Sequence, residues 1–311
     1  MTRQAGRVIL LGPQGDEPDV GRVVSEVAPD AKVAVVSAGW REWEEEERPV
    51  ARAFPESVNL TLWARAERVW AEDRELAEGH QAMQRRVRAL RLAYNIRLAR
   101  AMEAWMELLD ADGDGAVLDP ERADALESVR ALDRRHAQRL KAFRRTFEED
   151  YDPWNRGPVA RERAGLADAL DGIGVVVVDG GHVPSLLNRL RLFGLSDLLG
   201  ERILVACSGG AMAWTERVVL FHDSPPWGPG HAELGEVGLG LIRGVVALPH
   251  GSTRLRLDDR ARVRRFALRF APDAAVLLDP GTRLEWRGEW LPGRSRRLVA
   301  SGDVQEWQGA A

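Results

Sequence analysis

Short runs of apolar residues recur along the chain, each bounded by glycine, proline or aspartate. They occupy residues 8–11, 33–36, 175–178, 203–206, 245–248 and 274–278. Nearly continuous apolar runs are typical of strands that are buried on both faces of a parallel sheet. Helical stretches such as residues 185–192 lie between several of these runs. This alternation predicts an α/β fold with a doubly wound, mostly parallel sheet.

Residues 59–151 lack a strand pattern and predict long helices. Apolar residues recur there at steps of three and four, the spacing of one helix face. They are Met83, Val87, Leu90, Tyr94, Leu98, Met102, Trp105 and Leu109, followed by Leu126, Val129, Leu132, His136, Leu140, Phe143 and Phe147. An acidic turn at residues 110–119 separates the halves, so we expect a helical hairpin. We expect it to be inserted into a single α/β domain spanning residues 1–311, with antiparallel edge strands in residues 282–307.

The strongest local motif is an apolar strand that ends in Ala206-Cys207-Ser208-Gly209-Gly210 and runs into a helical pattern. A nucleophile on a sharp strand-to-helix turn needs small residues two positions before and after it, because the turn crowds the backbone there. Ala206 and Gly210 meet this need for Ser208, and the Gly209 N–H could stabilise an oxyanion. The alternative is an ordinary glycine-rich turn between a strand and a helix.

Reactive side chains follow the other predicted strands as well. His250 follows the run at 245–248, and Asp279 follows Ala274–Leu278. In open α/β sheets, ligands bind beyond the carboxyl ends of the strands. A serine, a histidine and an acid at neighbouring strand ends are the groups that nucleophilic acyl transfer requires. Taken singly, His250 could be a loop histidine and Asp279 the first residue of a turn.

Four segments carry a family resemblance: Asp179-Gly180-Gly181-His182, Ala206 to Ala211, Gly238 to Ile242, and Val245 to His250. They resemble the cyanophycinase and aspartyl dipeptidase group of serine peptidases, which has a class I glutamine amidotransferase-like, flavodoxin-like fold. The resemblance covers residues 175–311, extends more weakly to the N-terminal strands and omits the hairpin. It implies that Ser208 is the nucleophile, that His250 is the base and that the Gly181 backbone contributes to the oxyanion site.

The sequence also departs from the family pattern. Gly209 replaces the usual alanine after the serine, and His182 replaces an asparagine. The family's Asp-Glu pair after the last strand, whose glutamate completes the triad, appears here as Asp279-Pro280. Asp279 or Asp223 could take the place of this glutamate; otherwise the site works as a serine–histidine dyad or is inactive.

The turn between the two predicted helices matches the calcium loop of an EF-hand. Calcium prefers carboxylates and a backbone carbonyl as ligands. Leu118 departs from the pattern at position nine, and a solvated acidic turn is the alternative. The expected calcium ligands are Asp110, Asp112, Asp114, the Ala116 carbonyl and Glu121.

Charge and cysteine content narrow the possible functions. The formal net charge is −4, from 44 basic and 48 acidic residues, so no overall field favours nucleic acid or a membrane surface. No apolar run is long enough for a signal peptide or a membrane span. Cys207 is the single cysteine, which excludes an internal disulfide and fits a cytoplasmic protein.

We therefore expect a cofactor-independent serine hydrolase, peptidase-like, that acts on a small peptide or amide. One alternative is a non-catalytic scaffold whose triad has decayed, with the hairpin as an arm for a protein partner or for a second copy of the chain. Another is a thiol enzyme that uses Cys207.

Overall fold

The apolar runs of the N-terminal and central parts of the chain form the core of a seven-stranded sheet. This computed structural model describes residues 6–46, 49–223, 230–291, 293, 295–307 and 309. Five neighbouring strands of the sheet are parallel. In sheet order these are β1 (Arg7–Leu11), β5 (Ile203–Cys207), β4 (Ile173–Val178), β2 (Lys32–Val36) and β3 (Val58–Asn59). Beside β1 lie the antiparallel strands β10 (Arg283–Trp286) and β11 (Trp290–Leu291), which confirm the predicted antiparallel edge.

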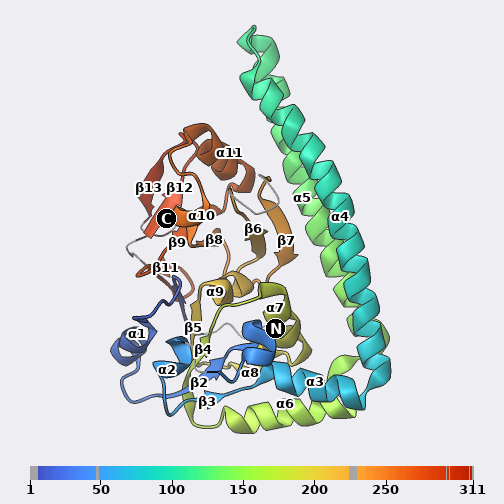
Figure 1. The fold of residues 1–311 in the computed structure, drawn as a ribbon. Coiled ribbons are helices and arrows are strands. Elements are labelled where there is room, and N and C mark those ends of the chain that lie inside the picture. Colours follow the sequence, from blue (N-terminus) through green and yellow to red (C-terminus); the bar gives the residue numbers. More distant parts are fainter. Residues whose placement is uncertain are drawn as a thin grey trace.

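Helices cover both faces of this sheet, and alternate side chains of each strand face the two layers (Figure 1). Ile9 and Leu11 of β1 pack toward α1 (Val20–Val27) and α2 (Pro49–Arg52). The intervening Val8 and Leu10 face the opposite layer. That layer contains α3 (Leu62–Glu72), α6 (Gly157–Ala169), α7 (Val183–Leu192), α8 (Leu195–Leu198) and α9 (Gly209–Trp214).

The last two predicted parallel strands belong to a second sheet, which corrects the expectation of one continuous sheet. Its order is β13-β12-β9-β8. Strands β8 (Val245–Pro249) and β9 (Ala274–Leu278) are parallel, and β12 (Ser295–Leu298) and β13 (Val304–Trp307) are antiparallel. A further antiparallel pair, β6 (Arg217–Leu220) and β7 (Glu233–Val237), stands apart from both sheets. Two short helices, α10 (Gly251–Arg254) and α11 (Arg260–Phe270), complete this part.

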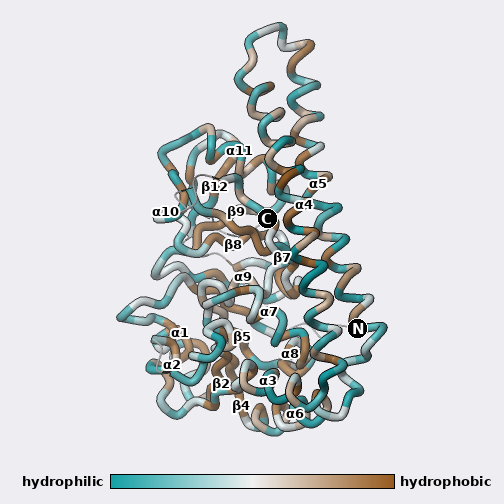
Figure 2. The backbone as a smooth tube through the Cα atoms, turned by 45° about the vertical axis from the view of Figure 1, so that its right-hand side comes forward, coloured by the Kyte–Doolittle hydropathy of each residue, from teal (hydrophilic) through white to brown (hydrophobic). Residues whose placement is uncertain are grey.

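The predicted helical hairpin is present and lies beside both sheets (Figures 1 and 2). It consists of α4 (Arg74–Asp110) and α5 (Gly115–Tyr151), each 37 residues long. At a rise of about 1.5 Å per residue, each helix is about 55 Å long. In the sequence, the hairpin lies between β3 and β4. The apolar face predicted for its helices is largely buried, with Met83, Leu98 and Trp105 on α4 and Val129 and Leu140 on α5.

A buried polar cluster fixes the middle of the hairpin to α11. The Arg269 guanidinium donates to both oxygens of the Asp133 carboxylate, at 2.8 Å each. It also donates to the Tyr94 hydroxyl at 2.9 Å, and that hydroxyl donates to Asp133. The three side chains are at most 5% exposed, and the Leu234 N–H donates to Tyr94 from β7. One network therefore joins α4, α5, α11 and β7.

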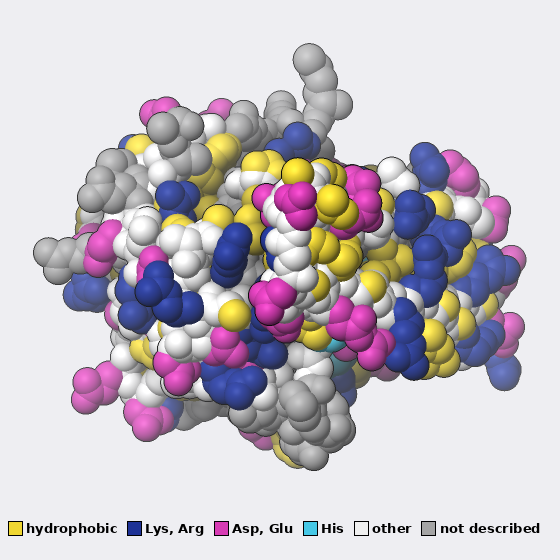
Figure 3. Space-filling model, turned by 90° about the horizontal axis from the view of Figure 1, so that it is seen from above, with side chains coloured by type: hydrophobic (Ala, Val, Ile, Leu, Met, Phe, Trp, Pro, Cys, Tyr) yellow, Lys and Arg dark blue, Asp and Glu magenta, His cyan; other side chains and the backbone are white. Residues whose placement is uncertain are grey.

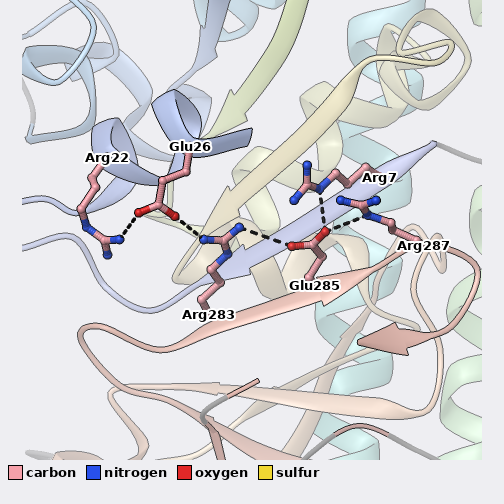
Figure 4. A network of polar contacts seen from close by, with 6 residues as sticks. All are labelled: Arg7, Arg22, Glu26, Arg283, Glu285 and Arg287. Carbon is pink, nitrogen blue, oxygen red and sulfur yellow. Dashed lines mark hydrogen bonds and ion pairs between the residues drawn. The ribbon is translucent and has the colours of Figure 1, made fainter. Parts of the chain in front are cut away.

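A second network attaches the antiparallel edge strand to the parallel sheet, and it lies near the surface (Figure 4). Glu285 on β10 pairs with Arg7 on β1 at 2.6 Å and with Arg287 at 2.8 Å. Arg283 on β10 bridges to Glu26 on α1 at 2.8 Å. Partly exposed pairs of this kind contribute at most about 1 kcal/mol each. The backbone pairing of β10 with β1 therefore determines the position of the edge.

We expect the Asp133→Ala substitution to lower the free energy of unfolding by about 3–5 kcal/mol, because it leaves the Arg269 charge buried and unpaired. Chemical denaturation measures this change. The matched control is Glu127→Ala, which breaks an exposed pair with Arg134 on the same helix and should have a much smaller effect, because solvent screens this pair. Equal effects of the two substitutions would show that the buried cluster does not anchor the hairpin.

Candidate active site

Ser208 lies at a sharp turn between β5 and α9. Its backbone angles are φ 52° and ψ −118°, a strained conformation for a residue with a side chain. The turn is held by the Ser208 N–H, which donates to the Leu11 carbonyl of β1 at 3.0 Å. The residue is half-buried. The predicted strained strand-to-helix geometry is therefore present at the carboxyl end of a central parallel strand.

Small residues flank this turn because the backbone is crowded there. Ala206 is fully buried in the sheet. A Cβ atom at Gly210 would lie 2.5 Å from the Val178 carbonyl oxygen and 2.7 Å from that of Asp179. A side chain at position 210 would thus push α9 away from the end of β4. These distances show why residue 210 must be small, which is the steric requirement that identified Ser208 as the turn residue.

The loop that follows β4 packs directly against the turn. A Cβ at Gly180 would lie 3.3 Å from the Ser208 Cβ and 3.2 Å from the Gly209 nitrogen. Gly181 has φ +89°, a conformation that favours glycine, and its carbonyl oxygen lies 3.2 Å from the Cβ position of Gly209. The structure thus brings Gly181 and Gly209, the two predicted oxyanion residues, next to Ser208.

The Asp179 side chain holds this loop in shape, a role that sequence reasoning missed. One carboxylate oxygen accepts from the Gly180 N–H at 2.7 Å, and the other accepts from Trp40 Nε1 at 2.8 Å. Asp179 is buried, with 7% exposure. An aspartate directly before two glycines at a strand end is the sequence signal that could have indicated this role.

His250 follows β8, as predicted, but it is not bonded to Ser208. Its backbone is left-handed, with φ 56°, and its N–H donates to the Leu278 carbonyl. Among the described residues, no hydrogen bond joins the His250 ring to the Ser208 hydroxyl. Burial lowers the pKa of His250, and the nearby Arg254 charge lowers it further, while Asp279 opposes the shift. The ring is therefore mainly neutral at pH 7.

Neither candidate acid contacts the His250 ring, which differs from the predicted triad. Asp279 accepts from the Ser252 N–H at 2.9 Å, from the Ser252 hydroxyl at 2.6 Å and from Arg296 at 3.0 Å. Asp223 accepts from Arg262 Nε at 2.6 Å and from the Arg256 N–H at 2.7 Å. Both carboxylates thus have other partners, and the third triad residue is not assembled.

At the carboxyl end of β1, the residues of the Ser208 turn meet those that follow β9. Leu11 bonds to Ser208, and the next residue, Gly12, touches the backbone of Asp279: a Cβ at Gly12 would lie 1.9 Å from the Asp279 oxygen. Gly12 also donates to the Thr282 carbonyl at 3.0 Å. The carboxyl ends of β5 and β9 are therefore neighbours, although they belong to different sheets.

Cys207 does not have the environment of a catalytic thiol. It is fully buried, and burial raises its pKa well above the ordinary value, with repulsion from Asp179 and Asp19 adding to the shift. A nucleophilic cysteine needs a lowered pKa and some exposure. The structure therefore does not support the alternative in which Cys207 is the nucleophile.

The acids of the hairpin tip do not converge as the calcium hypothesis expected. Helix α5 already begins at Gly115, so Ala116 and Glu121 lie within it, and Asp114 caps it by accepting from the Ala116 N–H. In the described part of the chain, no three His, Cys, Asp or Glu side chains are grouped to hold a metal. In the view from above, the acidic side chains around the hairpin form separate patches (Figure 3).

A guanidinium closes this turn instead. Arg122 donates to the carbonyls of Leu108 at 2.9 Å and Ala111 at 2.8 Å, and it pairs with Asp119. A cationic side chain at the end of α4 satisfies carbonyls that the helix leaves open. Asp110 and Asp112 are exposed nearby. Calcium binding by Asp110, Asp112, Asp114, Ala116 and Glu121 stays a prediction, and it would require the first turn of α5 to unwind.

We expect Gly210→Ala to destabilise the protein by about 1–3 kcal/mol, since the new methyl group would overlap the carbonyls of Val178 and Asp179. Gly15→Ala is the matched control, because a Cβ there meets no atom within 4 Å. Its effect should stay within about 0.5 kcal/mol. Thermal or chemical unfolding compares the two, and equal stabilities would contradict the close packing of α9 on β4.

Comparisons with known proteins leave the family open. A scan against protein-family models and a search of curated proteins both found no match. Among solved structures, the chain is similar to the crystal structure of a peptidase from an acI-B1 Actinobacterium. The similarity covers 100% of this chain and 97% of that one, at 13% identity and a TM-score of 0.43. None of the described helices is long and apolar enough to cross a membrane.

Proposed function

We propose that this chain is a serine hydrolase of the peptidase type, with Ser208 as its nucleophile. The observation that carries the proposal is the strained backbone of Ser208 at the end of β5, with the Gly180-Gly181 loop packed on it. Backbone strain is retained where the surrounding structure enforces it, and such positions cluster at active sites. The arrangement presents a serine side chain at the sheet edge where α/β proteins bind their ligands.

The chemistry follows from these positions. The Ser208 oxygen would attack the carbonyl carbon of a peptide or amide, while His250 takes the hydroxyl proton and later donates it to the leaving amine. The N–H groups of Gly181 and Gly209 would stabilise the negative oxygen. Water would then attack the ester formed on Ser208 and release a carboxylate. Because His250 is not bonded to Ser208, its ring would have to come within hydrogen-bonding reach of the Ser208 hydroxyl when substrate binds.

A second candidate function is a non-catalytic scaffold that binds a protein partner, or a second copy of the chain, through the hairpin. The hydrogen-bond partners of Asp279 and Asp223 favour this scaffold function. Asp279 is held by Arg296 and Ser252, and Asp223 is held by Arg262. In a scaffold, these carboxylates would have structural roles, and no acid would be needed beside His250.

Labelling with a fluorophosphonate separates the two functions. We expect a covalent adduct on Ser208, located by peptide mass spectrometry, because an activated serine at an oxyanion site reacts with such probes. Ser208→Ala should abolish the label. Ser301→Ala, which changes an exposed serine bonded only to Asp303 among the described residues, should leave it intact. An unlabelled, correctly folded wild-type protein would favour the scaffold.

The pH profile tests His250 as the base. The neutral ring is the active form and its pKa is lowered, so hydrolysis of a p-nitrophenyl ester should fall only at a pH below about 6.5. Arg254→Gln removes a positive charge that disfavours the protonated ring, so the acid limb of kcat/KM should move to higher pH. An acid limb that stays in place in this variant would argue against His250.

A further inference from the structure

A second concave site lies at the foot of the hairpin, away from Ser208. It is a cavity of about 40 Å³ between α4, α5, the turn at Pro153–Asn155 and the C-terminal end of α7. The Gln84 side chain of α4 donates to Asn188 of α7 at 3.2 Å and closes one edge. Met83, Phe147 and Leu192 supply apolar walls. We call this space the foot cavity.

Two arginines line the foot cavity, and each has hydrogen-bond donors without an acceptor among the described residues. Arg144 is 7% exposed, and its Nη2 donates to Glu236. Its Nε and Nη1 have no acceptor in the described part of the chain. Arg191 donates through Nη2 to the carbonyls of Val237 and Gly238, whereas its buried Nη1 lacks an acceptor. Leaving buried donors unpaired is costly, so three such nitrogens around one space point to a ligand that accepts hydrogen bonds.

Charges of both signs surround the foot cavity. Arg144 and Arg191 bring two positive charges, and Glu236 is the buried carboxylate that compensates one of them. Glu148 lies at the exposed rim. Burial lowers the pKa of Arg191 to about 9, and repulsion by Arg144 contributes to this shift. Burial and the charges of Arg189 and Arg144 lower the pKa of His80 in the same wall to about 4, so that this ring is neutral at pH 7.

We propose that the foot cavity binds a small organic carboxylate. Its two oxygens would accept hydrogen bonds from Arg144 and Arg191, and guanidinium groups match carboxylates in geometry and charge. A short aliphatic part would contact Met83, Phe147 and Leu192. At about 10–15 Å³ per water, a cavity of about 40 Å³ has room for roughly three waters, which suits an anion the size of acetate or propionate.

The ligand would act as a bridge within the fold. Arg144 is on α5 and Arg191 is on α7, whose first residue follows the Gly180-Gly181-His182 loop beside Ser208. A bound carboxylate would therefore tie the foot of the hairpin to the helix that continues from the candidate oxyanion loop. This site is independent of the proposed hydrolase activity.

The test measures thermal unfolding of the full chain in sodium acetate or propionate against sodium chloride at equal ionic strength and pH 7. A ligand that binds the folded state raises the melting temperature with concentration. We expect a rise with acetate and propionate that is absent with chloride. Absence of any carboxylate-specific rise overturns the proposal, as does a rise with phosphate but with neither carboxylate.

Variants then locate the site. Arg191→Met should weaken carboxylate binding at least tenfold in calorimetric titration, because it removes one charge and its donors. Arg145→Met is the matched control: Arg145 follows Arg144 on the same helix, its side chain is 72% exposed, and it should leave binding unchanged. Met83→Trp fills the cavity without altering its charge and should also abolish binding. Unchanged binding in a folded Arg191→Met or Met83→Trp variant overturns the assignment.

Discussion

The buried ion pair between Asp133 and Arg269 attaches the helical hairpin to α11, beside the smaller sheet. A hairpin of two 37-residue helices packs against β7, α11 and α3. Its middle is bonded to α11 and β7 through Asp133 and Tyr94, and its foot is bonded to the larger sheet's helices through Gln84–Asn188 and Asp73–Arg156. The pair is buried, so its geometry is specific, and replacing one partner leaves an uncompensated charge.

Much of the fold could be predicted because its signals are local. The steps of three and four in the hairpin and the apolar runs of the strands identify elements without knowledge of their partners. Ala206 and Gly210 identified the Ser208 turn because small residues two positions before and after a nucleophile are a local pattern, although the crowding at Gly210 comes from the carbonyls of Val178 and Asp179. The division into two sheets could not be predicted in this way. Apolar runs at 203–206 and 245–248 both indicate burial on two faces, and neither shows which strand lies next to it.

The candidate site illustrates the same limit. His250 and Asp279 follow strand ends as expected, but their partners depend on long-range contacts: Arg296 and Ser252 occupy the Asp279 carboxylate. At the hairpin tip, the spacing of Asp110, Asp112 and Asp114 fits a calcium loop. It does not reveal that the helix restarts at Gly115 or that Arg122 bonds to the preceding carbonyls. The spacing of acidic residues predicts candidate ligands, but the conformation of the backbone between them decides whether they converge on one cation.

The hairpin also has a mechanical consequence. It is supported at its foot and at its middle, and its tip extends past the rest of the molecule (Figure 1). A beam supported at two points and loaded at its free end turns about the nearer support, which here is the contact with α11 through Arg130–Leu268 and Asp133–Arg269. A sideways force on the tip would thus reach α11 and the smaller sheet before it reached the larger one. A force on the hairpin tip would therefore produce a turning moment at the boundary between the two larger sheets, where Gly12 contacts Asp279.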